Sequence, residues 1–360
     1  MPTFDIATIV KVFVPAVLSF TIGIGITPLL THYLYKHTMW KKRAGKTGSE
    51  GESTVLFNKL HESREVGIPR LGGVVIWFSA ATTIALIFLF AQVFPIPAIM
   101  KLDFLSRSQT WIPLAVLLLG AGIGLVDDFF EILGNGDHKA GGLSLRKRLM
   151  LVGLIGLLTG FWFYAKLDVS AISIPFNGLL PVGPYLIPLF ALVAIAIYSG
   201  GIIDGIDGLA GGVFAIIFAA YGMIAFFQNQ IDLAAFCAVI LGGILAFLWF
   251  NIPPARFYMS ETGSMALTLS LTVVAFLTDL PGGGEGLLLL PIIAFPLVIT
   301  SLSAIIQLGS KRYRHKKVFL IAPLHHHFEA LGWPPHKVTM RYWIIGVIFA
   351  IIGIIFALVG

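Results

Sequence analysis

Long apolar segments recur along almost the whole chain, and they constrain its fold more than any other feature. Each is close to the roughly 20 residues that an α-helix needs to cross a bilayer. Hydrophobic residues make up 57% of the 360 residues and charged residues only 12%, unlike the composition of a soluble domain. The sequence therefore predicts an all-α polytopic membrane protein with about ten transmembrane helices, at 10–35, 71–94, 111–127, 147–165, 184–203, 208–227, 232–250, 262–279, 287–309 and 342–359.

The domain organisation is simple, because no soluble domain interrupts these segments and we expect one integral-membrane domain over residues 1–360. The stretch from Val10 to Leu30 is too long for a signal-peptide core and lacks a small-residue cleavage site, so we expect it to stay as the first helix. The single cysteine, Cys237, lies in an apolar segment, which is typical of a small core residue and excludes an intrachain disulfide. Residues 168–183, DVSAISIPFNGLLPVG, predict a short hairpin between two helices.

Basic residues are concentrated in a few loops. If the chain starts outside, its cytoplasmic loops are 36–70, 128–146, 204–207, 251–261 and 310–341. These loops and their edges contain all of the 24 Lys and Arg residues except Lys11, Lys101, Arg107 and Lys166. Basic loops are usually cytoplasmic, so we expect both termini outside. The net charge of +6 is thus explained by membrane topology and lipid headgroups, with no nucleic acid as partner.

Four polar motifs, far apart in sequence, fall on the cytoplasmic side of this topology. Charged groups at membrane depth are costly and usually functional. We therefore expect a cytoplasmic active-site cleft built from GLVDDFFE (124–131), IDGIDG (203–208), FNIPPARFYMSETGS (250–264) and APLHHHFE (322–329).

The first motif contains the adjacent acids Asp127 and Asp128 at the end of an apolar segment. Adjacent helical side chains point about 100° apart, so both face one site only at a frayed end or from the wall of a cleft. Carboxylates suit Mg²⁺, which proteins often hold through one or two carboxylates together with substrate phosphates. We interpret the pair as ligands of a metal that carries a phosphorylated substrate; two solvated residues at a helix end are the alternative.

The second and third motifs add further acids. Asp204 and Asp207 alternate with glycines that permit close backbone approach, and the helix that follows offers N-terminal amides to an anion. Asp207 as a simple helix cap is the alternative. Glu261 follows Asn251 and Tyr258 across a Pro-Pro turn. It is either a third acid of the cleft or a favourable charge in the first turn of a helix.

The fourth motif contains three consecutive histidines, His325, His326 and His327. Three adjacent side chains cannot all bind one zinc ion without backbone strain, and no cysteine accompanies them. We favour phosphate binding or proton transfer, for which imidazole is suited near neutral pH. A metal and phosphate site in a membrane protein predicts transfer of a phospho-group from a soluble donor to a lipid acceptor, which requires positioning and charge neutralisation.

The motifs VDDFF, DGIDGLAGG, FLWFNIPPARFYMSETGS and APLHHHFE, in this order and spacing, resemble the polyprenyl-phosphate N-acetylhexosamine-1-phosphate transferases, from about Pro69 to the C-terminus. Within that superfamily, APLHHHFEALGWPPHKVTMRYWIIG is similar to the phospho-N-acetylmuramoyl-pentapeptide transferases. The resemblance implies ten helices, a homodimer, Mg²⁺ dependence and a multi-pass protein of the bacterial inner membrane. It also implies transfer of phospho-MurNAc-pentapeptide from UDP-MurNAc-pentapeptide to undecaprenyl phosphate, which gives lipid I and UMP.

The resemblance implies catalytic and metal-binding roles for five residues. Glu261 would bind Mg²⁺ that bridges the diphosphate. Asp127 and Asp128 would bind the metal or accept a proton from the lipid phosphate. His325 and His326 would contact phosphate or sugar.

The resemblance also implies substrate-binding roles for five further residues. Asp204, Asp207 and Asn251 would hold the uridine side of the donor, and Tyr258 would stack on uracil. Arg148, at a position where the family has Lys, would reach a diphosphate oxygen.

The chain departs from the family pattern at several positions. GIPRLGG (67–73) is more like the branch that uses UDP-N-acetylglucosamine, and Gly201 replaces an expected Asn. Val66 and Glu131 replace lysines, and Glu261 replaces a metal-binding Asp. A sibling transferase that uses UDP-N-acetylglucosamine and a catalytically silent member therefore stay as alternatives. A transporter would place acids inside helices and show inverted repeats, neither of which is evident.

Overall fold

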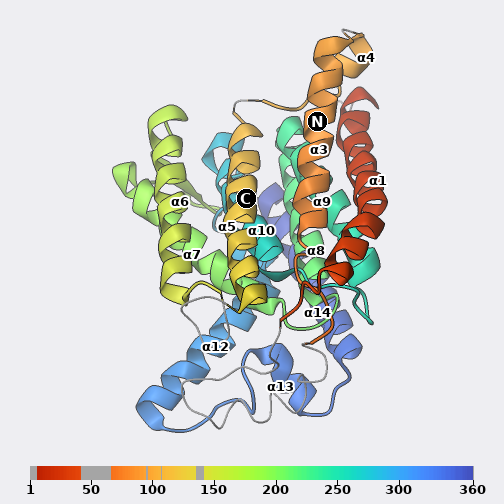
Figure 1. Cartoon of the computed structure of the whole chain (residues 1–360). Helices are drawn as coiled ribbons and strands as arrows, with labels where there is room; N and C mark the ends of the chain where they lie inside the picture. The colour runs from red at the N-terminus through yellow and green to blue at the C-terminus, as the bar shows by residue number, and fades with distance from the viewer. Residues whose placement is uncertain (1–5, 42–65, 95, 107, 135–141, 360) are drawn as a thin grey trace.

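The structure is a computed structural model that describes residues 6–41, 66–94, 96–106, 108–134 and 142–359. Parts of two expected cytoplasmic loops, 42–65 and 135–141, lie outside the described residues. Within the described part, nine helical segments are long and apolar enough to cross a membrane. The prediction of an all-α polytopic protein is confirmed (Figure 1) by α1 (Ile6–Lys36), α3 (Val74–Val93), α5 (Trp111–Leu133), α6 (Leu145–Lys166), α7 (Leu186–Gly200), α8 (Leu209–Phe227), α9 (Ile231–Asn251), α10 (Ser260–Leu277) and α14 (Pro335–Val359).

The tenth expected helix, 287–309, is divided. The structure breaks this segment at Ala294 into α11 (Leu290–Ile293) and α12 (Phe295–Arg314). Prolines lie in the first turn of both pieces, where a missing N–H is tolerated, so the sequence favours two helix starts here. The helix α12 ends in the basic residues Lys311, Arg312 and Arg314 and extends toward α13 (Leu324–Ala330) beyond the ends of the other helices (Figure 1). It is therefore less apolar than the nine spans.

The shorter elements lie between the long helices. The predicted hairpin is present as strands β1 (Ala171–Ile174) and β2 (Gly178–Pro181), which pair antiparallel. Two buried acids, Asp279 and Glu285, hold it to the bundle by accepting the backbone N–H groups of Ser173 (3.2 Å) and Phe176 (3.1 Å). The remaining short elements are α4 (Pro97–Met100) and the 3₁₀ turns η1 (Gly183–Tyr185), η2 (Gly201–Ile203) and η3 (Leu280–Gly282).

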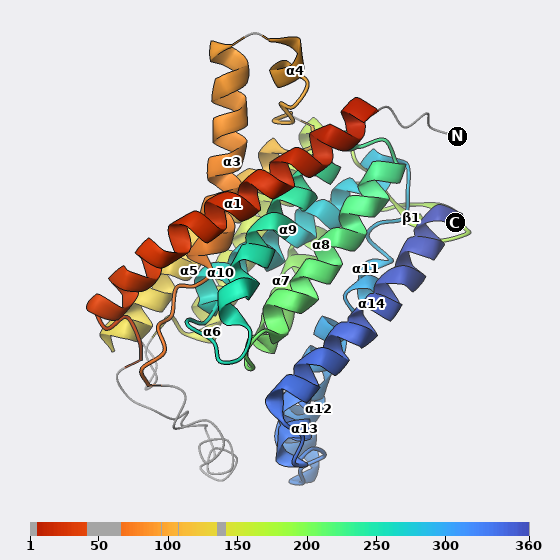
Figure 2. The same ribbon diagram turned by 90° about the vertical axis from the view of Figure 1, so that its right-hand side faces the viewer.

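The two ends of the bundle differ in composition. Figure 2 shows that α1 begins and α14 ends at the same end of the bundle, which also carries β1 and α4. A contact between Phe176 of the hairpin and Phe356 of α14 (ring centroids 6.0 Å apart) confirms this placement. The helix α13 lies at the opposite end. Contacts described below join the four polar motifs at that opposite end, so the prediction that they converge is confirmed.

The helix α10 forms the centre of the bundle, because every one of its residues except Glu261 is buried. It packs closely against α5 through glycine. A Cβ atom at Gly124 would lie only 2.2 Å from the carbonyl oxygen of Glu261, so the two backbones are in direct contact. Small residues at helix interfaces permit this approach, which stabilises association where lipid supplies no hydrophobic driving force.

Substitution of Gly124 tests this contact. We expect Gly124→Ala to lower the free energy of unfolding by about 1–3 kcal/mol, because the added methyl group overpacks a rigid interface. Gly122→Ala is the matched control, since a Cβ atom at Gly122 meets nothing within 4 Å. The control should be neutral or stabilising by up to about 1 kcal/mol, because alanine favours helix. Thermal unfolding in detergent measures both; equal midpoints for the two variants would contradict the close α5–α10 contact.

Candidate active site

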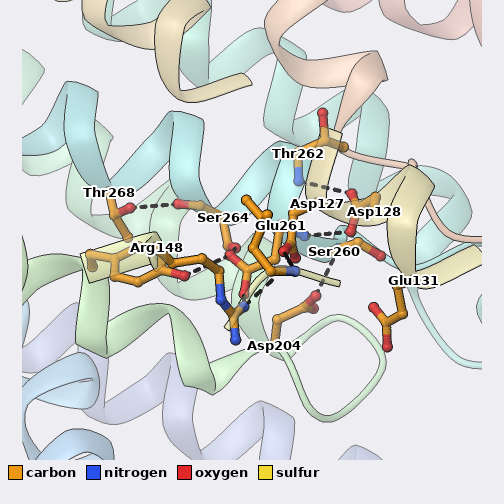
Figure 3. A network of polar contacts seen from close by, with 12 residues as sticks. Asp127, Asp128, Glu131, Arg148, Asp204, Ser260, Glu261, Thr262, Ser264 and Thr268 are labelled. Atoms are coloured by element: carbon orange, nitrogen blue, oxygen red, sulfur yellow. Dashed lines mark hydrogen bonds and ion pairs between the residues drawn. The ribbon is translucent and has the colours of Figure 1, made fainter. Parts of the chain in front are cut away.

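Asp128 joins the end of α5 to the start of α10. Its side chain is fully buried, and its two oxygens accept the backbone N–H groups of Glu261 (3.1 Å) and Thr262 (2.9 Å). The first N–H groups of a helix have no partner within the helix, and a carboxylate there also interacts favourably with the helix dipole. Asp128 therefore acts as a cap for α10, supplied by another helix (Figure 3). Its predicted role in metal binding stays a prediction.

Asp127, Arg148 and Glu261 come together from α5, α6 and α10 (Figure 3). The Arg148 guanidinium forms an ion pair with the Glu261 carboxylate and lies 3.8 Å from an oxygen of Asp127. The other Asp127 oxygen accepts the backbone N–H of Leu143 (2.5 Å), just before α6. Two carboxylates from different helices thus share one cation.

Glu261 and Arg148 are the partly exposed members of this group. The Glu261 and Arg148 side chains are 24% and 22% exposed, whereas that of Asp127 is 4% exposed. One oxygen of Glu261 is held by Arg148. The second oxygen of Glu261 accepts the Tyr198 hydroxyl (3.2 Å) and lies 3.4 Å from the hydroxyl of Ser264. The cluster is therefore accessible to a ligand at Glu261 and Arg148. Tyr198 was not among the predicted site residues; a polar aromatic residue that directly precedes SGGIIDGIDG was the available signal.

The loop that contains IDGIDG reaches the same place. One oxygen of Asp204 accepts the backbone N–H of Ser260 (2.9 Å), the residue at which α10 begins. Figure 3 shows the Asp204 side chain beside Glu261. Asp204 is thus next to the acid cluster, as the sequence predicts.

Asp207 and Asn251 tie this loop to the segment that precedes α10. The Asn251 side chain accepts the N–H of Gly208 (2.9 Å) and donates to the carbonyl of Phe257 (2.8 Å). Asp207 accepts the N–H of Ala255 (3.1 Å). Both residues therefore order the loops around the site. Their predicted contacts with uridine stay predictions.

Two of the three histidines lie against the same loop. A Cβ atom at Gly205 would be 2.7 Å from Nε2 of His325 and 2.8 Å from Nε2 of His326, so a larger residue there would displace the two rings. His326 also contacts Glu329 through Nδ1 (2.7 Å). His327 instead accepts the N–H of Leu320. The expectation that the three side chains do not converge is confirmed.

The backbone of Tyr258 connects the site to the 66–73 loop. Its N–H donates to the carbonyl of Pro69 (2.9 Å), and its carbonyl accepts the N–H of Gly72 (2.8 Å). This pairing brings Arg70 to the end of α5, where its guanidinium lies 3.1 Å from the carboxylate of Glu131. Arg70 was not predicted as a site residue, because only the fold shows that this loop meets α5. The role of the Tyr258 ring stays a prediction.

The sequence of this chain is similar to that of known proteins. Residues 110–279 match the family described as Glycosyl transferase family 4. A phospho-N-acetylmuramoyl-pentapeptide-transferase of Geobacillus sp. is 34% identical, over 93% of this chain and 94% of its own length. The chain belongs to the phospho-N-acetylmuramoyl-pentapeptide transferase family. Relatives of the same name occur in Chloroflexus aurantiacus (32% identical over 80% and 76%) and Thermoanaerobacter sp. (31% over 94% and 96%).

Some of the departures from the family pattern noted in the sequence take part in ion pairs. Arg148 and Glu261, which replace a Lys and an Asp of the family pattern, form an ion pair with each other. Glu131, which replaces a Lys, pairs with Arg70 in the atypical GIPRLGG loop. Glu261 and Glu131 therefore each have a cation directly beside them, Arg148 and Arg70 respectively.

The acid cluster offers two candidate ligands for the predicted magnesium ion. Asp127 and Glu261 offer hard oxygen donors that already approach one cation, Arg148. Within the described residues no three acidic, histidine or cysteine side chains are grouped as metal ligands. A magnesium ion held by Asp127 and Glu261 would therefore take its remaining ligands from phosphate and water, as is common for this ion.

The two aspartates differ in role, and their asparagine variants should differ too. We expect Asp127→Asn to lose nearly all transfer activity while the unfolding midpoint changes little, because Asn can still accept the Leu143 N–H. Asp128→Asn should lower the free energy of unfolding by about 1–3 kcal/mol, since its amide nitrogen faces a buried N–H that it cannot accept. Activity assays and thermal unfolding of both variants measure this; a fully stable Asp128→Asn would contradict the capping role.

The Arg70–Glu131 pair is tested by charge exchange. Arg70→Glu and Glu131→Arg should each reduce turnover by about tenfold or more, equivalent to about 1.4 kcal/mol, because each places like charges together beside Asp127. The double variant Arg70→Glu/Glu131→Arg should recover a substantial part of the loss. If the double variant loses as much activation free energy as the two single variants together, the two residues act independently.

Proposed function

We propose that this protein transfers phospho-MurNAc-pentapeptide from UDP-MurNAc-pentapeptide to undecaprenyl phosphate in the presence of Mg²⁺, forming lipid I and UMP. The observation that carries the proposal is the convergence of Asp127, Arg148 and Glu261 from three membrane helices, with Asp204 beside them. A site of this kind at one end of a membrane bundle can receive a soluble diphosphate donor and a lipid-borne phosphate. The name of the relatives supports the choice of donor.

The reaction forms one P–O bond and breaks another. An oxygen of the lipid phosphate attacks the phosphorus that carries the sugar, and the bond to UMP breaks. A phosphate monoester is mostly dianionic near pH 7, because its second pKa is about 6. Removal of a proton by Asp127 therefore contributes only from the monoanionic form, and neutralisation of the phosphate charges is the larger requirement.

The residues of the cluster supply that neutralisation. Arg148, held in place by Asp127 and Glu261, presents a planar guanidinium that matches phosphate oxygens. When bound, Mg²⁺ would polarise and neutralise the diphosphate at the two carboxylates. His325 and His326, beside the loop that starts at Asp204, would contact phosphate or sugar from the opposite wall.

We propose that the bundle end that carries α13 faces the cytoplasm of a bacterial inner membrane, with both termini outside. The basic end of α12, Lys311, Arg312 and Arg314, supports this orientation. We also propose a homodimer, which the family resemblance implies. The mass of the protein in native mass spectrometry tests the dimer, and labelling of a cysteine placed in the β1–β2 turn of a Cys237→Ala protein tests the orientation.

The choice of donor is tested directly. Purified protein with undecaprenyl phosphate and Mg²⁺ should release UMP from UDP-MurNAc-pentapeptide and form lipid I. UDP-N-acetylglucosamine should give no lipid product above background. Product formation from UDP-N-acetylglucosamine alone would assign the protein to the sibling activity, and no product from either donor would indicate a silent member.

Glu261 should be essential because it carries negative charge at the open side of the cluster. We expect Glu261→Gln to lower kcat by about 100-fold or more, equivalent to about 2.7 kcal/mol. Glu261→Asp retains the charge with one methylene less, so its activity should depend more steeply on Mg²⁺ concentration. Ser264→Ala is the matched control, since it removes only a weak contact with Glu261. An active Glu261→Gln with unaltered Mg²⁺ dependence would reduce Glu261 to a helix-start charge.

A further inference from the structure

A cavity of about 320 Å³ lies between α13 and the first turns of α14, apart from the acid cluster. Its volume is at the lower end of the range typical of small-molecule sites. The lining is almost entirely apolar and aromatic, and includes Phe328, Trp333, Val338, Tyr342, Ile345 and the stem of Arg341. None of the lining residues belongs to the acid cluster.

Two cations lie at the rim of the cavity. Phe328 and Trp333 stack on each other (centroids 4.7 Å apart), and the Arg341 guanidinium lies 4.1 Å from the Trp333 ring centroid. The Lys337 ammonium is 5.5 Å from the same centroid. In the part of the chain that the structure describes, neither Lys337 nor Arg341 forms an ion pair with a carboxylate. Both charges are therefore available to an external anion.

The position of the cavity along α14 matches the membrane interface. Arg341 lies in the second turn of this apolar span, and its neighbours Met340 and Ile344 are each 60% exposed on the bundle surface. Tryptophan and snorkelling cations are typical of the level where hydrocarbon meets headgroups. Figure 2 shows this start of α14 at the same end of the bundle as α13.

We propose that the cavity binds an anionic phospholipid of the surrounding membrane, with one acyl chain against Phe328, Val338 and Ile345 and the phosphate between Arg341 and Lys337. An apolar cavity with a cationic rim at headgroup depth matches both parts of such a molecule. A soluble anion would leave the apolar walls unfilled, and a neutral lipid would leave two cations without a partner.

The site borders the active site through one side chain. Tyr342 lines the cavity, and its ring lies edge-on to that of His325 (centroids 6.5 Å apart). His325 in turn lies against Gly205 of the IDGIDG loop. A bound lipid would therefore stabilise α13 and hold His325 in its position.

Quenching of Trp333 fluorescence by brominated acyl chains tests the proposal without donor or acceptor. The protein is placed in two samples of phosphatidylcholine nanodiscs. One sample contains a small fraction of brominated phosphatidylglycerol, and the other contains the same fraction of brominated phosphatidylcholine. The fluorescence of Trp333 is obtained as the difference in fluorescence intensity between the native protein and the Trp333→Phe variant. We expect brominated phosphatidylglycerol to quench the Trp333 fluorescence several-fold more efficiently than brominated phosphatidylcholine does. Arg341→Gln and Lys337→Gln should each weaken the preference, whereas Arg312→Gln, a basic control on α12, should retain it.

Three results would overturn the proposal. Equal quenching by both lipids would show that the rim does not select an anionic headgroup. Relief of quenching by millimolar inorganic phosphate would show that the rim binds the free anion alone. Displacement of phosphatidylglycerol by one equivalent of undecaprenyl phosphate would assign the cavity to the acceptor substrate.

Discussion

The two hydrogen bonds from the start of α10 to Asp128 are the contact on which the rest of the site depends. They fix the first turn of a helix that is buried everywhere except at Glu261. Gly124 keeps the backbones of α5 and α10 in contact, and the side chain of Glu261 extends from this contact toward Arg148. A structural carboxylate thus positions the carboxylate that we propose as a metal ligand.

The loops around the site use polar side chains in the same way. Asp207 and Asn251 each accept a backbone N–H of a neighbouring loop, and Asp204 accepts that of Ser260 at the start of α10. Backbone groups that enter the end of a membrane bundle need partners, since an unsatisfied group there costs several kcal/mol. The residues that the family resemblance assigns to the nucleotide therefore also maintain the shape of the cleft, and loss of activity alone does not separate the two roles.

Much of the architecture was predictable, because segment length and polarity report directly on membrane crossing. The convergence of the four motifs followed from topology. The break at Ala294 was not expected, although Pro291 and Pro296 carried a signal for it. The separate roles of Asp127 and Asp128 depend on which direction each side chain takes within α5, and the Arg70 contact depends on a loop pairing. Neither is encoded in local sequence spacing.

Binding of Mn²⁺, which replaces Mg²⁺ at oxygen sites and is visible by electron paramagnetic resonance, tests most directly whether Asp127 and Glu261 form one cation site. The measurement uses purified protein with UDP-MurNAc-pentapeptide and no lipid acceptor. The geometry predicts that Asp127→Asn and Glu261→Gln each weaken Mn²⁺ binding by about tenfold or more, equivalent to about 1.4 kcal/mol. Unchanged Mn²⁺ affinity in both variants would contradict a metal role for this pair.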